Sequence, residues 1–193
     1  WGGGLDFAGN DTIWEVWGRG KWLAGLMILQ SFSTTIFASV EDVVRAQPVV
    51  AMFMLMLVGV GGNAGAQAVV RSAQRIATDG YAPGHGVFHR HLEKEFPVSV
   101  WLALLLAWFA CGIVWAGEGG PSNAVAVAFS CGIIVVGSVL LGTALPFAFH
   151  RFELDTIHSG AVMQVLAGIW AMVVTCLMCS LFLVPTIAPQ TSG

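Results

Sequence analysis

The fold is decided by residues 52–75, which read MFMLMLVGVGGNAGAQAVVRSAQR. With the residues from Pro48 onward, the first part is an uncharged hydrophobic run long enough to cross a bilayer. Small and polar residues then follow, namely Gly59, Gly61, Gly62, Asn63, Gly65 and Gln67. The two amides stand four residues apart and so share one helical face, where they offer carbonyl oxygens at membrane depth. Because small residues also let helix backbones approach closely, the stretch predicts either a packing seam or a polar pathway.

Composition predicts an integral membrane protein. Of the 193 residues, 56% are hydrophobic and 10% are charged, with a mean hydropathy of +0.79, whereas soluble proteins have about 25% charged residues. The net charge of −3 comes with no basic patch of the kind that nucleic acid requires. No nucleophile–base pair or hydrolase-type metal spacing is present, so we expect no enzymatic activity.

The order of apolar and polar stretches predicts an all-α fold with five transmembrane helices. We expect an interfacial segment over residues 1–20, a membrane domain over 21–187 and a tail over 188–193. The expected spans are residues 22–40, 48–70, 98–116, 124–149 and 160–184. These runs are too long and too apolar for the strands of a membrane barrel.

The basic residues predict an orientation. With five spans, seven of the eight lysines and arginines fall on the side of the N-terminus, and only Arg45 falls on the other. By the positive-inside rule, the N-terminus lies on the cytoplasm-equivalent side. The chain begins at Trp1 rather than Met, so we expect that it was processed, excised or trimmed, and a processed start would be compatible with an organelle such as the plastid.

Several motifs resemble the MgtE family of magnesium transporters and channels. They are GGNAGAQ at 61–67, RGKWL at 19–23, KEF at 94–96, LGTALP at 141–146, HRFELD at 150–155 and SG at 159–160. The resemblance covers about residues 19–185, with the motifs in the family's order. It implies a membrane domain of five helices, Mg²⁺ as the transported ion and a homodimer with its pore between the subunits.

One departure from the family bears directly on mechanism. The family's last helix carries an aspartate that binds Mg²⁺ in the pore, whereas residues 163–169 read MQVLAGI here, with Gly168 or Ile169 in the matching place. Neutral amides attract a divalent cation less strongly than a carboxylate does. Acids near the membrane edge remain as candidate cation-attracting groups at the mouths of a pathway, namely Glu41, Asp42 and Asp155.

Histidines are the other candidate ligands. His85, His89 and His91 have a spacing that suits a transition metal, but the preceding YAPGHG favours a solvated loop. His150 and His158 flank a turn at the membrane edge.

Two classes of function follow. The first is a divalent cation transporter or channel, with Mg²⁺ as the ion by resemblance. The second is a non-transporting scaffold or pigment-binding subunit of a larger membrane complex that keeps the fold. If it binds a pigment such as chlorophyll, His150, His158 and Gln164 are the candidate ligands. The absorption spectrum and size of the purified protein distinguish the two.

Overall fold

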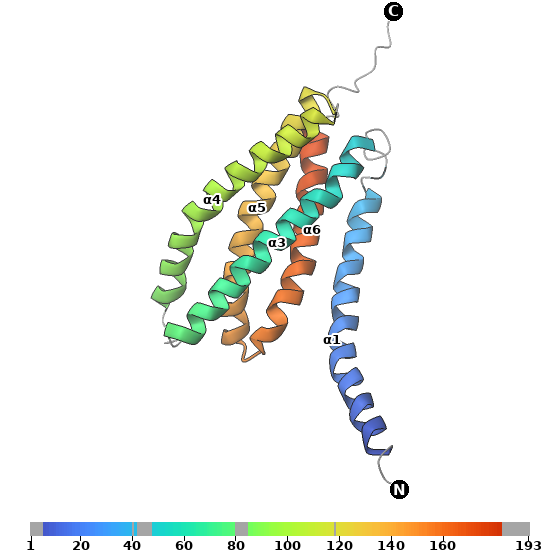
Figure 1. The fold of residues 1–193 in the computed structure, drawn as a ribbon, viewed down its shortest axis with the longest axis vertical. Helices are drawn as coiled ribbons and strands as arrows, with labels where there is room; N and C mark the ends of the chain where they lie inside the picture. Colours follow the sequence, from blue (N-terminus) through green and yellow to red (C-terminus); the bar gives the residue numbers. More distant parts are fainter. Residues whose placement is uncertain (1–5, 40, 42–47, 80–84, 118, 183–193) are drawn as a thin grey trace, which may run out of the picture.

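A computed structural model of the chain describes residues 6–39, 41, 48–79, 85–117 and 119–182. Its elements are α1 (Asp6–Ser39), α3 (Pro48–Asp79), α4 (His85–Ala116), α5 (Pro121–Arg151), the short 3₁₀ helix η1 (Thr156–His158) and α6 (Ser159–Phe182). No strand occurs in the described ranges, so the all-α prediction is confirmed. Successive long helices run in opposite directions, and the start of α1 and the end of α6 lie at opposite ends of the molecule (Figure 1).

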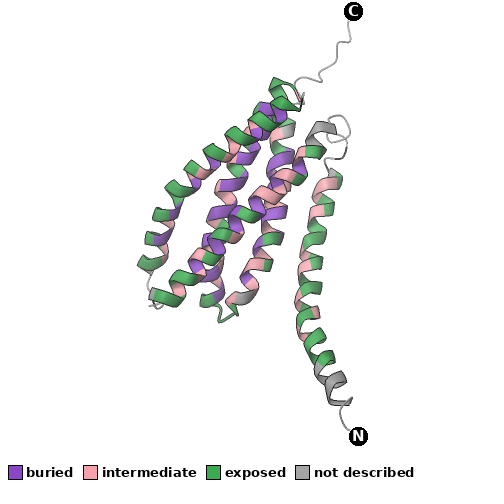
Figure 2. Cartoon of the chain, in the orientation of Figure 1, coloured by how far each residue is buried: buried purple, intermediate pink, exposed green. Residues whose placement is uncertain are grey.

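Helix α5 is the centre of the bundle, because α3, α4 and α6 all pack against it. The largest side chains with almost no exposed surface come from α5 and the helices around it, and include Leu57, Val114, Ile134, Val135 and Met163. Figure 2 shows the buried residues gathered on α5 and on the neighbouring sides of α3 and α6. Helix α1 packs along α6 and is exposed or half-buried at residues 12–38.

Among the residues that the structure describes, four helices are long and apolar enough to cross a membrane: Met52–Thr78, Gly86–Ala116, Pro121–Arg151 and Ser159–Phe182. The chain is therefore a helical integral membrane protein, and the fifth predicted span is not confirmed. Helix α1 has 34 residues, a length of about 51 Å. Its sequence places Glu15, Arg19 and Lys21 before the apolar part and QSFSTT at 30–35 within it.

The polar connection expected over residues 71–97 is largely helical. Helix α3 continues to Asp79 and α4 already begins at His85, so the interpretation of the histidines as loop residues is wrong for His89 and His91. The reason is a helical repeat that places His91, Glu95 and Ser99 on the buried side of α4. Helix α4 also continues through Pro97, immediately before the predicted start of the span.

The turn between α4 and α5 depends on a glycine. Gly120 has a φ of +76°, a conformation that residues with a Cβ rarely adopt. Pro121 follows as the first residue of α5, and the side-chain amide of Asn123 donates a hydrogen bond of 2.7 Å to the carbonyl of Gly119. This tight connection sets α4 antiparallel to α5.

Candidate functional site

The glycine motif of α3 lies where that helix meets α5. A Cβ placed on Gly61 would lie 2.6 Å from Cγ2 of Ile134, and one placed on Gly65 would lie 3.1 Å from the backbone oxygen of Ser138. From the other side, a Cβ on Gly142 of α5 would collide with the backbone oxygen of Gly65. The two backbones therefore touch without side chains between them, and Gly61 and Gly65, four residues apart, form the α3 half of this contact.

Gly62 faces a different neighbour, α6. A Cβ on Gly62 would lie 2.6 Å from Nε2 and 2.8 Å from Oε1 of Gln164. The side-chain amide of Gln164 thus lies against the α3 backbone, at the residue that precedes Asn63. The glycines of α3 therefore leave room both for the backbone of α5 and for a polar side chain of α6.

Three amides mark the side of α3 and α6 that the bundle leaves uncovered. Asn63, Gln67 and Gln164 are all exposed in the single chain, whereas the glycines at 61, 62 and 65 are buried. Asn63 and Gln67 are separated by one helical turn, a rise of about 6 Å. We call these three residues the amide row. It provides acceptor and donor groups at membrane depth and carries no formal charge.

The position that the resemblance matches to a pore acid lies close to the amide row. Gly168 follows Gln164 by four residues on α6 and is buried, and a Cβ on it would meet only Cγ1 of Val58, at 4.0 Å. There is room for a small side chain, but neither Gly168 nor Ile169 carries a charge. This arrangement can line a water-filled path but cannot bind a bare divalent ion strongly.

The candidate acids lie away from the amide row along the chain. Glu41 is exposed and follows α1, and Asp155 is exposed in the turn between α5 and η1. Asp42 lies outside the described residues. Their contribution as charges at the mouths of a pathway stays a prediction.

The histidines whose side chains the structure describes do not gather around one point, and the side chain of His85 lies outside that part. His89 forms an exposed ion pair with Glu93, with 3.4 Å between Nε2 and Oε1. His158 stacks on Trp22, with 4.5 Å between the ring centroids, and His150 is exposed at the end of α5. Within the described ranges, no three histidine, cysteine or acidic residues are grouped to hold a metal ion.

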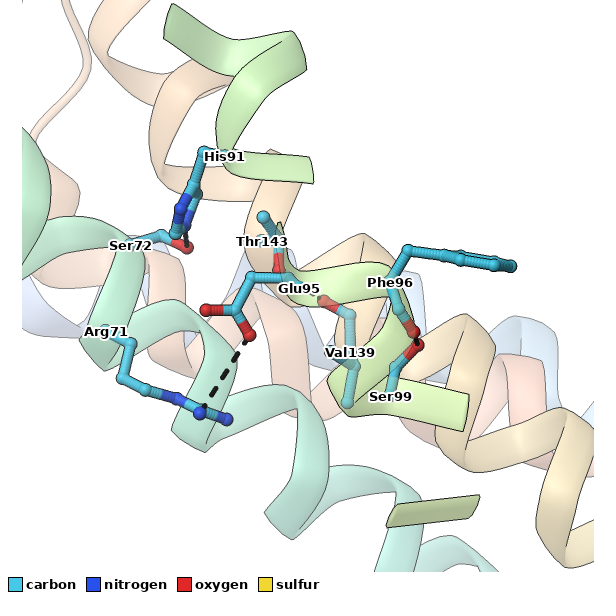
Figure 3. A network of polar contacts seen from close by, with 8 residues as sticks. All are labelled: Arg71, Ser72, His91, Glu95, Phe96, Ser99, Val139 and Thr143. Atoms are coloured by element: carbon cyan, nitrogen blue, oxygen red, sulfur yellow. Dashed lines mark hydrogen bonds and ion pairs between the residues drawn. The ribbon is translucent and has the colours of Figure 1, made fainter. Parts of the chain in front are cut away.

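The sequence analysis missed a polar junction between α3 and α4, which Figure 3 shows. Nη1 of Arg71 lies 3.9 Å from Oε2 of Glu95, and Oγ of Ser72 lies 3.1 Å from Nε2 of His91. The pairing joins two consecutive residues of α3 to two residues one turn apart on α4. The four-residue spacing of His91 and Glu95 was the available signal, and it becomes visible once this segment is read as a helix.

Two known proteins are similar to this chain in sequence. The magnesium transporter MgtE of Thermus thermophilus is 29% identical over 148 residues, which are 77% of this chain and 32% of that protein. The magnesium transporter MgtE of Bacillus subtilis is 23% identical over 159 residues, 81% of this chain and 34% of that protein. The chain thus spans about a third of the length of these two relatives.

The family match falls on the helices that build the site. Residues 54–163, more than half of the chain, match the MgtE family, described as divalent cation transporters. The matched range begins in α3, includes all of α4 and α5, and ends at the start of α6. It contains the glycine motif, Asn63 and Gln67. This chain therefore belongs to the MgtE family of divalent cation transporters.

Proposed function

We propose that the chain forms a pathway for a divalent cation, Mg²⁺, between two copies of itself in a lipid bilayer. The observation that carries this proposal is the amide row, three polar side chains exposed on α3 and α6. Polar groups at membrane depth are unfavourable unless they face protein or water. Both curated relatives are magnesium transporters, which supports Mg²⁺ as the ion.

A second copy is the simplest way to cover this face. Most soluble homo-oligomers are two-fold symmetric, and the same geometry would set the amide row of one subunit opposite that of the other. Six amides from two subunits could then surround a hydrated ion, since Mg²⁺ gives up its water reluctantly. Without a carboxylate in the row, we expect weak affinity and loose selectivity.

The basic residues support a sidedness for this pathway. The end of α3, the start of α4 and the end of α5 lie at the same end of the molecule as the start of α1 (Figure 1). They carry five of the basic residues, Arg71, Arg75, Arg90, Lys94 and Arg151. This end would face the cytoplasm-equivalent side. A protease site inserted at Gly84 should be cut from the side that exposes a tag at Trp1; cleavage from the opposite side contradicts the orientation.

Transport can be tested with the purified chain in liposomes that contain a Mg²⁺-sensitive dye. The parent should take up Mg²⁺, and Gln67→Met should lower the rate about tenfold or more, because it removes an amide that would hold the hydrated ion while keeping the side-chain length. Leu55→Met, at an exposed position of the same helix, is the matched control and should keep the parental rate. A parent that takes up no Mg²⁺ above protein-free liposomes contradicts the proposal.

The alternative function, a pigment-binding subunit, predicts a different absorption spectrum and a different size for the purified protein. Two of its candidate ligands already have contacts within the chain, since His158 stacks on Trp22 and Gln164 lies against Gly62. A visible absorption band that copurifies with the protein in a large assembly would favour this alternative. A colourless dimer would favour the transporter.

A further inference from the structure

The polar junction between α3 and α4 contains a carboxylate that has little water around it. The side chain of Glu95 is 6% exposed, whereas that of its partner Arg71 is 42% exposed. The 3.9 Å between Nη1 and Oε2 is too long for a hydrogen bond, and Oε2 has no hydrogen-bond partner. The buried charge of Glu95 is therefore stabilised by the positive charge of Arg71, whereas the charge of Arg71 is also stabilised by solvent.

More basic than acidic groups lie around His91, which precedes Glu95 by one helical turn. The charged residues that act on neighbouring His91 are Arg71, Arg75, Lys94 and Glu95, three basic groups and one acid. His91 is 4% exposed and contacts Ser72 of α3 and the ring of Phe147 of α5. The junction is thus closed by packing and by a hydrogen bond that does not need Glu95. Removing the charge of Glu95 would leave the helices in contact but the basic groups unbalanced.

Arg71 lies at the end of the amide row. It follows Gln67 by four residues, so the two side chains share one side of α3. Side chains on a helix lean toward its N-terminus, over the residue one turn earlier. A free Arg71 would therefore extend over Gln67. In the structure its guanidinium instead points across to Glu95 on α4 (Figure 3).

We propose that Glu95 is a positioning residue that holds the guanidinium of Arg71 away from the amide row and balances its charge. The proposal rests on the proposed function, because it assigns to Glu95 the task of keeping one end of the cation pathway open. A guanidinium over Gln67 would repel a divalent cation, and this repulsion is twice that felt by a monovalent ion at the same distance. Glu95 would contact neither the ion nor the amides.

The test compares four variants of the full chain in the liposome assay for Mg²⁺ uptake. Glu95→Gln should lower uptake about tenfold or more, since it releases a positive charge next to the path. Adding Arg71→Gln to that variant removes this charge and should restore uptake to within about threefold of the parent. Arg71→Gln alone should also transport at close to the parental rate. Glu93→Gln is the matched control, because Glu93 is 64% exposed on the same helix and pairs with His89 instead.

The pattern of rates separates this role from a purely structural one. If the ion pair only holds the helices together, Arg71→Gln and the double variant should be as impaired as Glu95→Gln, and this result overturns the proposal. Equal uptake by Glu95→Gln and Glu93→Gln also overturns it. A parent that transports no Mg²⁺ contradicts the proposed function itself, a distinct outcome. Elution as a single peak in gel filtration, required of each variant, distinguishes a lost pathway from a lost fold.

Discussion

The two sides of α3 place opposite demands on the same helix. On the side of α5, Gly61 and Gly65 bring two backbones together, and any added side chain meets closely packed atoms. On the other side, Asn63 and Gln67 are exposed and lie outside the hydrophobic core. The first side packs within one chain, whereas the second is open in the single chain, and under the proposed function water, an ion and another subunit cover it. The packing contact and the proposed pathway thus lie less than one helical turn apart on α3.

Substitutions on the glycine side of α3 should have the largest effect on folding. Gly65→Leu should abolish the folded monomer, because its side chain would meet Met163 and the backbone oxygen of Ser138, which lies 3.1 Å from the position of the Cβ. Overpacking usually destabilises a core by about 1–3 kcal/mol, and occasionally by more. Gly59→Leu on the same helix is the control, since a Cβ at Gly59 has no heavy atom within 4 Å. Gel filtration in detergent measures both.

Gly62→Leu tests how strictly the two sides are separated. Its Cβ would meet the amide end of Gln164, a flexible side chain that can turn away. We therefore expect Gly62→Leu to fold but to disturb the amide row, which gel filtration and the liposome assay measure in turn. If Gly65→Leu folds as well as Gly59→Leu does, the backbone contact between α3 and α5 is not what holds the bundle together.

The sequence was enough to predict the two sides of α3, but not which residues of α5 and α6 contact them. The small-residue spacing was enough to find a side of α3 without side chains, and the positions of Asn63 and Gln67 were enough to find a polar one. Neither could reveal that Gly142 would meet Gly65, or that Gln164 would lie on Gly62, because such contacts depend on how helices distant in sequence are arranged.

The prediction of a loop before Pro97 was wrong for a different reason. Its charges and histidines, from His89 to Glu95, look like a solvated loop when they are counted as a composition. At helical spacing, His91, Glu95 and Ser99 form one buried stripe, and its first two residues pair with α3. Polar residues that contact each other across two helices do not show an apolar period, so hydrophobicity alone could not find them.

An acid introduced on α6, next to the amide row, should have an intermediate effect on stability. Gly168→Asp puts a carboxylate four residues after Gln164, where a Cβ has room beside Val58. Without Mg²⁺ we expect a lower melting temperature, since a charged side chain near the bilayer centre costs about 3 kcal/mol. With Mg²⁺ at about ten times its Kd, binding should restore about 1.4 kcal/mol. Thermal melts in detergent with and without Mg²⁺ measure the difference.

The control for this variant is an equal ionic strength of NaCl, which screens charge but does not fill a divalent site. A melting temperature that Mg²⁺ raises more than NaCl does supports a hydrated path at Gly168. If Mg²⁺ gives no relief, the carboxylate is buried in a dry seam, and the comparison with the pore acid of the family fails at this position.

The amide side should give the smallest effect on folding. Gln67 is exposed in the single chain, so Gln67→Met should change the free energy of unfolding of the monomer by no more than about 0.5 kcal/mol. The same substitution is expected to lower Mg²⁺ uptake strongly, and this gap between stability and transport is what the separation of the two sides predicts. Chemical unfolding of the detergent-solubilised monomer measures the first quantity, and the liposome assay measures the second. A loss of several kcal/mol would mean that Gln67 is part of the fold, and the two sides of α3 would then no longer be distinct.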